Sequence, residues 1–168
     1  MFAPVKNHEF LIDIFASVVK KHQDSVLLLV GTGSEEEKIR GKVSMLGLSE
    51  KVIFAGRRTD VEKIMSAADA FVLPSHFEGL PLVLVEAQSS GLNCFVSDAV
   101  PEEAKLLDNF EFIPLDIGAE AWADRILSAA LNTDRASASA VVAAAGYDCK
   151  LTAARIEEIY SQQIALCL

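Results

Sequence analysis

The chain has 168 residues, 51% of them hydrophobic and 23% charged, so it can bury the core of one domain and does not have the composition of a disordered protein. Its net charge of −9 and aromatic content of 7% argue against binding to nucleic acid or to an anionic membrane. That charge is compatible with a small phosphate ligand, because a helix N-terminus and one lysine can hold a diphosphate.

Hydrophobic periodicity predicts helices that alternate with short apolar strands. In chain order, we expect a helix over 7–22, a strand over 25–31, a helix from Ser34 to about Gly47, a strand over 51–56, a helix over 59–68, a strand over 69–75, a helix over 80–91, a strand over 93–98, a short helix over 101–107, a strand over 111–115, and helices over about 119–130 and 150–166. Residues 135–146 are expected to form helix or loop. This alternation predicts an α/β fold with a Rossmann-like doubly wound parallel sheet, covered on both faces.

Local signals place the ends of two helices. Ser34 and Glu37 have the spacing of a capping box, while Pro81 is expected in a first turn and Gly91 past a helix end. The chain opens with a helix where a doubly wound sheet normally has a strand. The whole chain, 1–168, is therefore expected to be one domain of a longer protein.

Metal and disulfide sites are not expected. The cysteines, Cys94, Cys149 and Cys167, form no zinc or disulfide pattern and suit a reducing cytosol, and the histidines have no metal-ligand spacing. No signal peptide is expected, because the first residues lack a positive region followed by an apolar run, and runs such as "VLLLVG" are too short to span a bilayer.

The turn "VGTGSEE" joins a strand to a helix and contains Gly31 and Gly33. It matches a dinucleotide fingerprint only in part, because Glu36 stands where the third glycine would be. Two interpretations stay open: a tight turn with a solvated first helical turn, or a nucleotide near the two glycines.

The segment "SHFEGLPLVLVEA" has the features of an anion site. Glu78 and Gly79 lie in a loop, Pro81 presets a helix start, and the free amides near Leu82 would face the loop. Glu86 is the only charge between Glu78 and Asp98, which favours a specific partner over simple solvation, although both interpretations stay open. Residues 82–85 are expected to be core in either case.

Two further residues stand near this segment. Lys6 lies at the start of the first helix and is either a phosphate ligand or an ordinary surface lysine. His76 either lines the site or is only a loop residue.

These motifs resemble a known family. "VGTG", "FAGRR", "DAFVLPS" and the two acids that bracket "GLPLVLV" are together similar to the C-terminal, donor-binding domain of retaining glycosyltransferases, family 4 (group 1), which forms one half of a GT-B fold. The resemblance runs from about Pro4 to about Tyr160 and is strongest to bacterial exopolysaccharide and capsule enzymes.

The resemblance implies a role for each matching residue. Glu78 would contact the donor sugar and Lys6 would neutralise the phosphates, both as catalytic residues. Glu86 would bind the ribose hydroxyls. The substrate-binding residues would further include Gly79, Leu80, Pro81 and Leu82 at the diphosphate, Arg57 and Arg58 beside the nucleobase, and Gly31 and Gly33 near the nucleotide. No cofactor is implied beyond the nucleotide-sugar donor.

The family's arginine partner of Lys6 and its N-terminal acceptor domain have no counterpart in this sequence. We therefore expect the isolated chain to bind donor weakly and not to transfer sugar. In the family setting, a cytoplasmic protein would transfer a hexose-type sugar to a glycan or lipid-linked acceptor, with only peripheral contact to the inner face of the membrane, through the missing domain.

Three alternatives remain. A non-catalytic binding module is opposed by the intact Glu78, Glu86 and Lys6. A nicotinamide-dependent oxidoreductase is opposed by the incomplete glycine pattern. A glycosidase that uses Glu78 and Glu86 would need both carboxyl groups to face one cleft.

Overall fold

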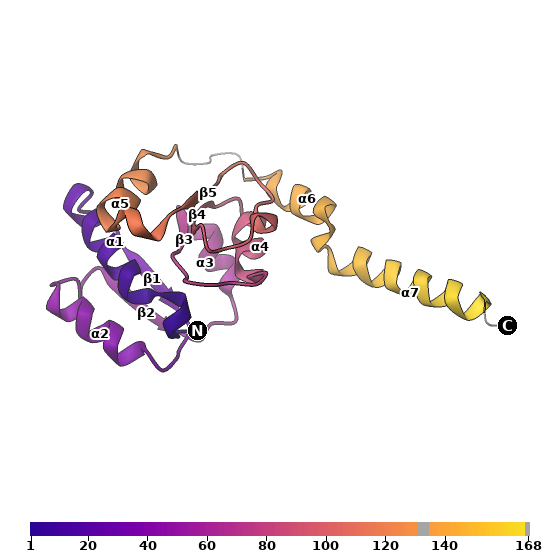
Figure 1. Cartoon of the computed structure of the whole chain (residues 1–168), viewed down its shortest axis with the longest axis horizontal. Helices are drawn as coiled ribbons and strands as arrows, with labels where there is room; N and C mark the ends of the chain where they lie inside the picture. Colours follow the sequence, from indigo (N-terminus) through magenta and orange to yellow (C-terminus); the bar gives the residue numbers. More distant parts are fainter. Residues whose placement is uncertain (131–134, 167–168) are drawn as a thin grey trace.

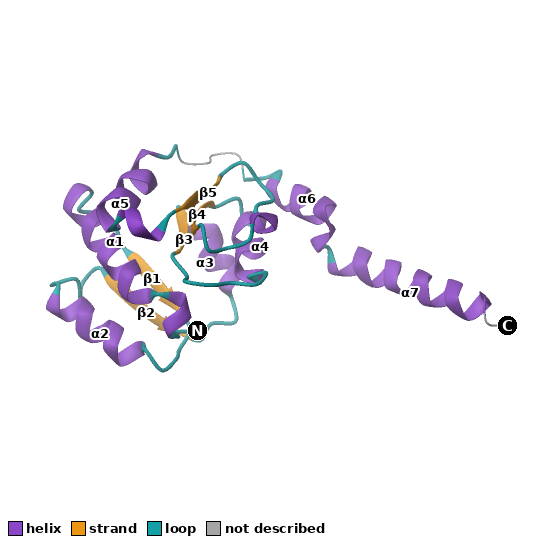
Figure 2. Ribbon diagram, in the orientation of Figure 1, coloured by secondary structure: helices purple, strands orange, loops and turns teal. Residues whose placement is uncertain are grey.

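Five short parallel strands form the centre of the molecule. The computed structural model describes residues 1–130 and 135–166, and hydrogen bonding divides its strands into two sheets (Figures 1 and 2). One sheet pairs two strands, β1 (Leu27–Val30) and β2 (Val52–Gly56). The other has the order β3 (Ala70–Leu73), β4 (Asn93–Ser97) and β5 (Phe110–Ile113).

The expected α/β class with parallel strands is confirmed, and the pairing adds a detail that the sequence did not predict. Both sheets are parallel throughout, but no pairing joins β1 to β3 among the described residues. All five residues of β4 are buried, as expected for a strand that is covered on both faces.

The helices follow the strands in the expected alternation. They are η1 (Pro4–Lys6), α1 (His8–Lys21), α2 (Glu36–Met45), α3 (Val61–Ala67), α4 (Leu82–Ser89), η2 (Glu102–Ala104), η3 (Leu115–Ile117), α5 (Ala119–Ser128), α6 (Ala138–Val142), η4 (Ala143–Tyr147) and α7 (Cys149–Leu166). The stretch expected to be helix or loop is α6 followed by a π-turn that breaks at Gly146, where φ is 99°.

The predicted capping box is wrong. The N-cap of α2 is Glu35, and no side chain caps this helix. Backbone groups satisfy the first-turn amides instead: the Glu35 N–H donates to the Phe2 carbonyl, and the Glu36 N–H donates to the Gly33 carbonyl. A side-chain cap at Ser34 is therefore not needed.

Two apolar clusters form the core. One lies between β1, β2 and helices α1, α2 and α5, and contains the fully buried Trp122, whose indole N–H donates to the Pro114 carbonyl at 2.8 Å. The other lies around β3, β4 and α4, and contains Leu84 and Val96. Cys94 and Cys149 are free thiols, and Cys167 lies outside the described residues.

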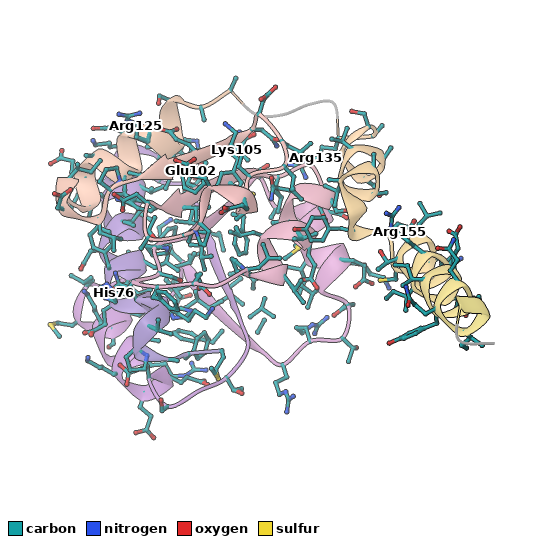
Figure 3. All side chains as sticks on the ribbon, turned by 45° about the vertical axis from the view of Figure 1, so that its right-hand side comes forward. His76, Glu102, Lys105, Arg125, Arg135 and Arg155 are labelled. Atoms are coloured by element: carbon teal, nitrogen blue, oxygen red, sulfur yellow. The ribbon has the colours of Figure 1, made fainter. Side chains whose placement is uncertain are left out.

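Helix α7 extends away from the rest of the molecule (Figures 1 and 3, where Arg155 marks it). Residues 151–164 are all exposed, including Leu151, Ile156, Ile159 and Tyr160. In the part of the chain that the structure describes, no helix combines the length and apolar character needed to cross a bilayer.

A buried glutamine ties α4 to the segment between β4 and β5. The Gln88 side-chain amide donates to the carbonyls of Leu84 and Ala104, and its oxygen accepts the N–H groups of Leu106 and Leu107 at 2.7 and 3.1 Å. Because these amides are turned toward Gln88, the predicted helix over 101–107 shrinks to the short turn η2. Gln88 thus fixes the direction in which α4 points.

Replacing Gln88 with methionine keeps the side-chain volume but removes the hydrogen-bond acceptor of the Leu106 and Leu107 N–H groups. We expect Gln88→Met to lower the free energy of unfolding by about 3 kcal/mol, since each buried unsatisfied group costs roughly 1–3 kcal/mol. Urea denaturation followed by circular dichroism measures this loss. Gln162→Met, on the exposed face of α7, is the matched control and should change stability by less than about 0.5 kcal/mol. Equal stability of the two variants would contradict this role for Gln88.

Candidate functional site

The site is built where the chain leaves β3 and meets the N-terminal turn η1. In parallel sheets, ligands bind beyond the carboxyl ends of the strands. The His76 N–H, from the loop after β3, donates to the Val5 carbonyl at 2.8 Å (His76 is labelled in Figure 3). On the other side of this loop, the Ser97 hydroxyl donates to the Ser75 carbonyl at 2.5 Å. The loop is therefore held from two sides.

An ion pair joins the two residues that were predicted as catalytic. The Lys6 ammonium donates to both carboxylate oxygens of Glu78, at 2.7 and 2.8 Å. The Glu78 side chain is 9% exposed and that of Lys6 is 24% exposed. The structure thus brings together residues 72 positions apart, and Lys6 is a partly buried member of an ion pair.

Helix α4 begins at Leu82, four residues after Glu78 in the chain. Pro81 is the N-cap, one position before the expected first turn, and no side chain caps the helix. The core face of α4 consists of Leu84, Ala87 and Gln88, which recur at helical spacing. Leu82 falls on the opposite side and is 65% exposed, so the prediction that the whole run 82–85 is core is wrong.

Glu86 lies on the same exposed side of α4 as Leu82. Residues four apart on a helix are neighbours, so the Glu86 carboxylate is about one turn from the open helix start. Glu86 is exposed and has no side-chain hydrogen bond or ion pair within the described residues, so the partner predicted for it is not present in this part of the chain. Its carboxylate is free to accept hydrogen bonds from a ligand.

The residues directly after Glu78, Gly79 and Leu80, leave open space beside the loop backbone. Gly79 does not adopt a left-handed conformation. A Cβ atom at Gly79 would meet nothing within 4 Å. Leu80 is 48% exposed. The backbone before α4 is therefore open to approach from outside.

Gly31 and Gly33 lie against the N-terminal segment. A Cβ atom on Gly33 would be 2.2 Å from the Phe2 carbonyl oxygen, and one on Gly31 would be 3.2 Å from the Met1 nitrogen. Gly31 also has a φ of 119°, which favours glycine. The backbone of Phe2 lies where a side chain on Gly33 would be, which gives these glycines a packing role.

Arg57 and Arg58 follow β2. The Arg58 guanidinium donates two hydrogen bonds to the Asp60 carboxylate, at 2.9 and 2.8 Å, and this pairing lowers the pKa of Asp60. Arg57 is exposed and has no ion pair within the described ranges. Of the two arginines, Arg57 is the one free to meet a ligand.

Sequence reasoning gave little weight to two polar residues near the site, the partly buried His8 and the buried Ser75. The His8 ring packs edge-on against Phe2, with 4.9 Å between ring centroids, and its Nδ1 has no hydrogen-bond partner. Burial, the chain's amino terminus and Lys6 together lower the pKa of His8 to about 4. The fully buried Ser75 hydroxyl also has no partner. Their positions, at a helix start and at a strand end, are the signals that could have singled them out.

Comparison with known proteins identifies the family. The model of the family described as "Glycosyl transferases group 1" matches residues 1–144. The chain belongs to the group 1 glycosyl transferases. Among relatives of this transferase chain, the Bacillus subtilis protein EpsF, named as a glycosyltransferase, is 32% identical over 163 residues, covering 95% of this chain and 42% of EpsF. An Escherichia coli enzyme named as a UDP-Gal-dependent α-1,3-galactosyltransferase is 35% identical over 98 residues, covering 56% of this chain and 25% of the enzyme.

Solved structures show the same fold. The pneumococcal O-GlcNAc transferase GtfA superposes with a TM-score of 0.82 at 20% identity, over 95% of this transferase chain and 34% of GtfA. Anabaena HepE gives a TM-score of 0.73 at 24% identity, over 96% of this chain and 46% of HepE. The predicted resemblance to a GT-B fold is therefore confirmed. The chain spans less than half the length of these relatives.

In the described ranges, no three His, Cys, Asp or Glu side chains are grouped so that they could hold a metal ion. The cationic side chain at the site is Lys6, which is bound to Glu78.

The two glycine positions allow a matched comparison. Gly79→Ala is expected to fold like the wild type, because its Cβ atom enters open space, and to weaken nucleotide binding if the ligand approaches there. Gly33→Ala should instead lower stability by about 2 kcal/mol or more, because the Phe2 backbone must move. Thermal unfolding separates the two effects. A large loss of stability in Gly79→Ala would contradict the open geometry.

His8 makes stability depend on pH in a defined direction. Its folded pKa of about 4 lies below the ordinary value of 6.5, so acid favours the unfolded chain, which takes up the proton more readily. Stability from this group is full above pH 6.5 and falls as the pH drops toward 4. We expect His8→Phe to lose less stability than the wild type between neutral pH and about pH 5.5, as measured by urea denaturation. His22→Phe, at an exposed position, is the control and should keep the wild-type response.

Proposed function

We propose that this chain is the donor-binding domain of a retaining, family 4 glycosyltransferase that transfers a hexose-type sugar from a nucleotide diphosphate donor. The acceptor would be a glycan or a lipid-linked sugar of bacterial polysaccharide synthesis. One observation carries this proposal. Glu78, the uncapped start of α4 and the free Glu86 lie on one continuous loop–helix segment, and Lys6 lies on the turn η1, which is hydrogen-bonded to that segment.

Each group has a chemical task in this proposal. The diphosphate would bind the free amides at the start of α4 and the Lys6 ammonium, with Gly79, Leu80 and Pro81 forming the surrounding backbone. Charge that develops on the departing diphosphate would be stabilised by the same helix start and cation.

The two acids would bind opposite parts of the donor. Glu78 would accept hydrogen bonds from the sugar, and Glu86 would accept two from the vicinal ribose hydroxyls, as acids do in dinucleotide sites. Arg57, which has no ion pair in the described ranges, would lie beside the nucleobase, and Gly31 and Gly33 would shape the nearby turn.

The names of the relatives support a uridine nucleotide. The Escherichia coli relative is named for its UDP-Gal donor, and GtfA and HepE were solved with UDP and a sugar. We extend this to the present chain as a UDP-type donor. This chain covers less than half of each of these relatives, which supports the view that it is part of a longer protein. A further domain of that protein would bind the acceptor. The protein would be cytoplasmic and would contact the inner face of the membrane only through that domain.

Titration of the 15N-labelled chain with UDP, followed by amide chemical shifts, tests the donor site even when binding is weak. We expect Glu86→Ala and Lys6→Ala each to weaken UDP binding by about tenfold or more, since each removes a charge-assisted hydrogen bond. Glu157→Ala, on exposed α7, is the control for loss of an acid and should bind like the wild type. Unchanged affinity in Glu86→Ala would refute the site.

A further inference from the structure

The two residues proposed to hold the donor bind each other in this structure. Both oxygens of Glu78 accept hydrogen bonds from Lys6, so the ammonium charge that would meet a diphosphate is already neutralised. We propose, building on the function above, that Glu78 is an internal counter-ion that occupies the phosphate position on Lys6 until a donor displaces it.

The burial of the pair makes this exchange costly enough to matter. Exposed ion pairs contribute little, but the Glu78 carboxylate is 9% exposed and keeps little contact with water. A carboxylate buried to this degree needs hydrogen-bond donors. Lys6 donates both of the hydrogen bonds that the structure shows to the Glu78 carboxylate. A ligand that takes Lys6 must therefore give Glu78 new donors or leave a buried charge unpaired.

The backbone on both sides of the pair is fixed, so the exchange is a side-chain event. The bond from His76 to Val5 holds the loop to η1, and the bond from Ser97 to Ser75 holds it to β4. The flexible element is the lysine stem. Beside it, the position of a Gly79 Cβ is empty and the start of α4 has no side-chain cap, which leaves room for an anion.

This exchange predicts a preference between two ligands of the same site. A sugar nucleotide brings hydroxyl groups that can donate to Glu78 when Lys6 turns to the phosphates. A free nucleoside diphosphate lacks the hydroxyl groups of the donor sugar, and its ribose hydroxyls would bind Glu86, so Glu78 competes for Lys6 throughout. The pair would therefore favour the donor over the diphosphate product and assist product release.

Four proteins test the exchange: the wild type, Glu78→Gln, Lys6→Ala and the double variant, each titrated with UDP and with UDP-glucose by amide chemical shifts. We expect Glu78→Gln to bind UDP about fivefold more tightly than the wild type, because Lys6 is released. The same variant should gain less for UDP-glucose, because the charged acceptor for the sugar hydroxyls is replaced by the weaker, neutral amide oxygen. In the Lys6→Ala background, the gain for UDP should disappear.

Controls separate this proposal from general charge effects and from misfolding. Glu111→Gln breaks the remote pair with Arg125 and removes one negative charge, so its UDP affinity should equal that of the wild type. A native-like amide spectrum of Glu78→Gln confirms its fold. A gain that persists without Lys6, or that Glu111→Gln reproduces, overturns the exchange.

The outcomes also distinguish this proposal from the proposed function. If UDP binds and depends on Glu86, but Glu78→Gln binds it no more tightly than the wild type, only the exchange fails. If UDP binds to none of the four proteins, the donor site itself is refuted, and the exchange falls with it.

Discussion

A partly buried lysine and glutamate, 72 positions apart in the chain, connect the two segments from which the site is made. The glutamate can be buried because the lysine binds both of its oxygens. The lysine can reach it because η1 is bonded to the loop through Val5 and His76. This contact joins η1 to the loop that leads through Gly79 into α4, the helix that carries Glu86.

Helix α4 can serve a ligand at its N-terminus because the opposite side is held in the core. Leu84 and Ala87 are fully buried, and Gln88 uses both ends of its amide to join α4 to the segment before β5. A helix of eight residues would not be stable alone, so tertiary packing sets its direction. The side chains that do not face the core, Leu82 and Glu86, are left at the surface.

The alternation of apolar runs with amphipathic segments was enough to place every strand and most helices, because burial in a parallel sheet leaves a clear pattern. The pattern could not show that β1 and β3 stay unpaired, since partners in a sheet are chosen by three-dimensional contacts. It also misplaced the start of α2, whose N-cap is Glu35 and which has no side-chain cap at Ser34.

For the site, charge and turn chemistry singled out Glu78, Glu86 and the helix start, whereas Lys6 was assigned a role only by the family resemblance. The sequence did not show that Lys6 would bind Glu78, because a contact over 72 positions leaves no local signal. It also assigned Leu82 to the core from hydrophobicity alone, whereas the helical period turns this residue outward.

The net charge of −9 sets a last constraint on how this site can work. A protein with this charge repels an anionic nucleotide at long range, and salt screens that repulsion beyond about 10 Å. Recognition must therefore come from contacts at short range, where a helix start and a single ammonium act over a few ångströms. With Lys6 held by Glu78, even the local positive charge is neutralised in this structure. Under the proposed exchange, such a site would have little general affinity for phosphates and would favour a ligand that satisfies the lysine and the glutamate together. In a cell rich in phosphate compounds, the ion pair would thus act as a filter for a sugar that is joined to a diphosphate.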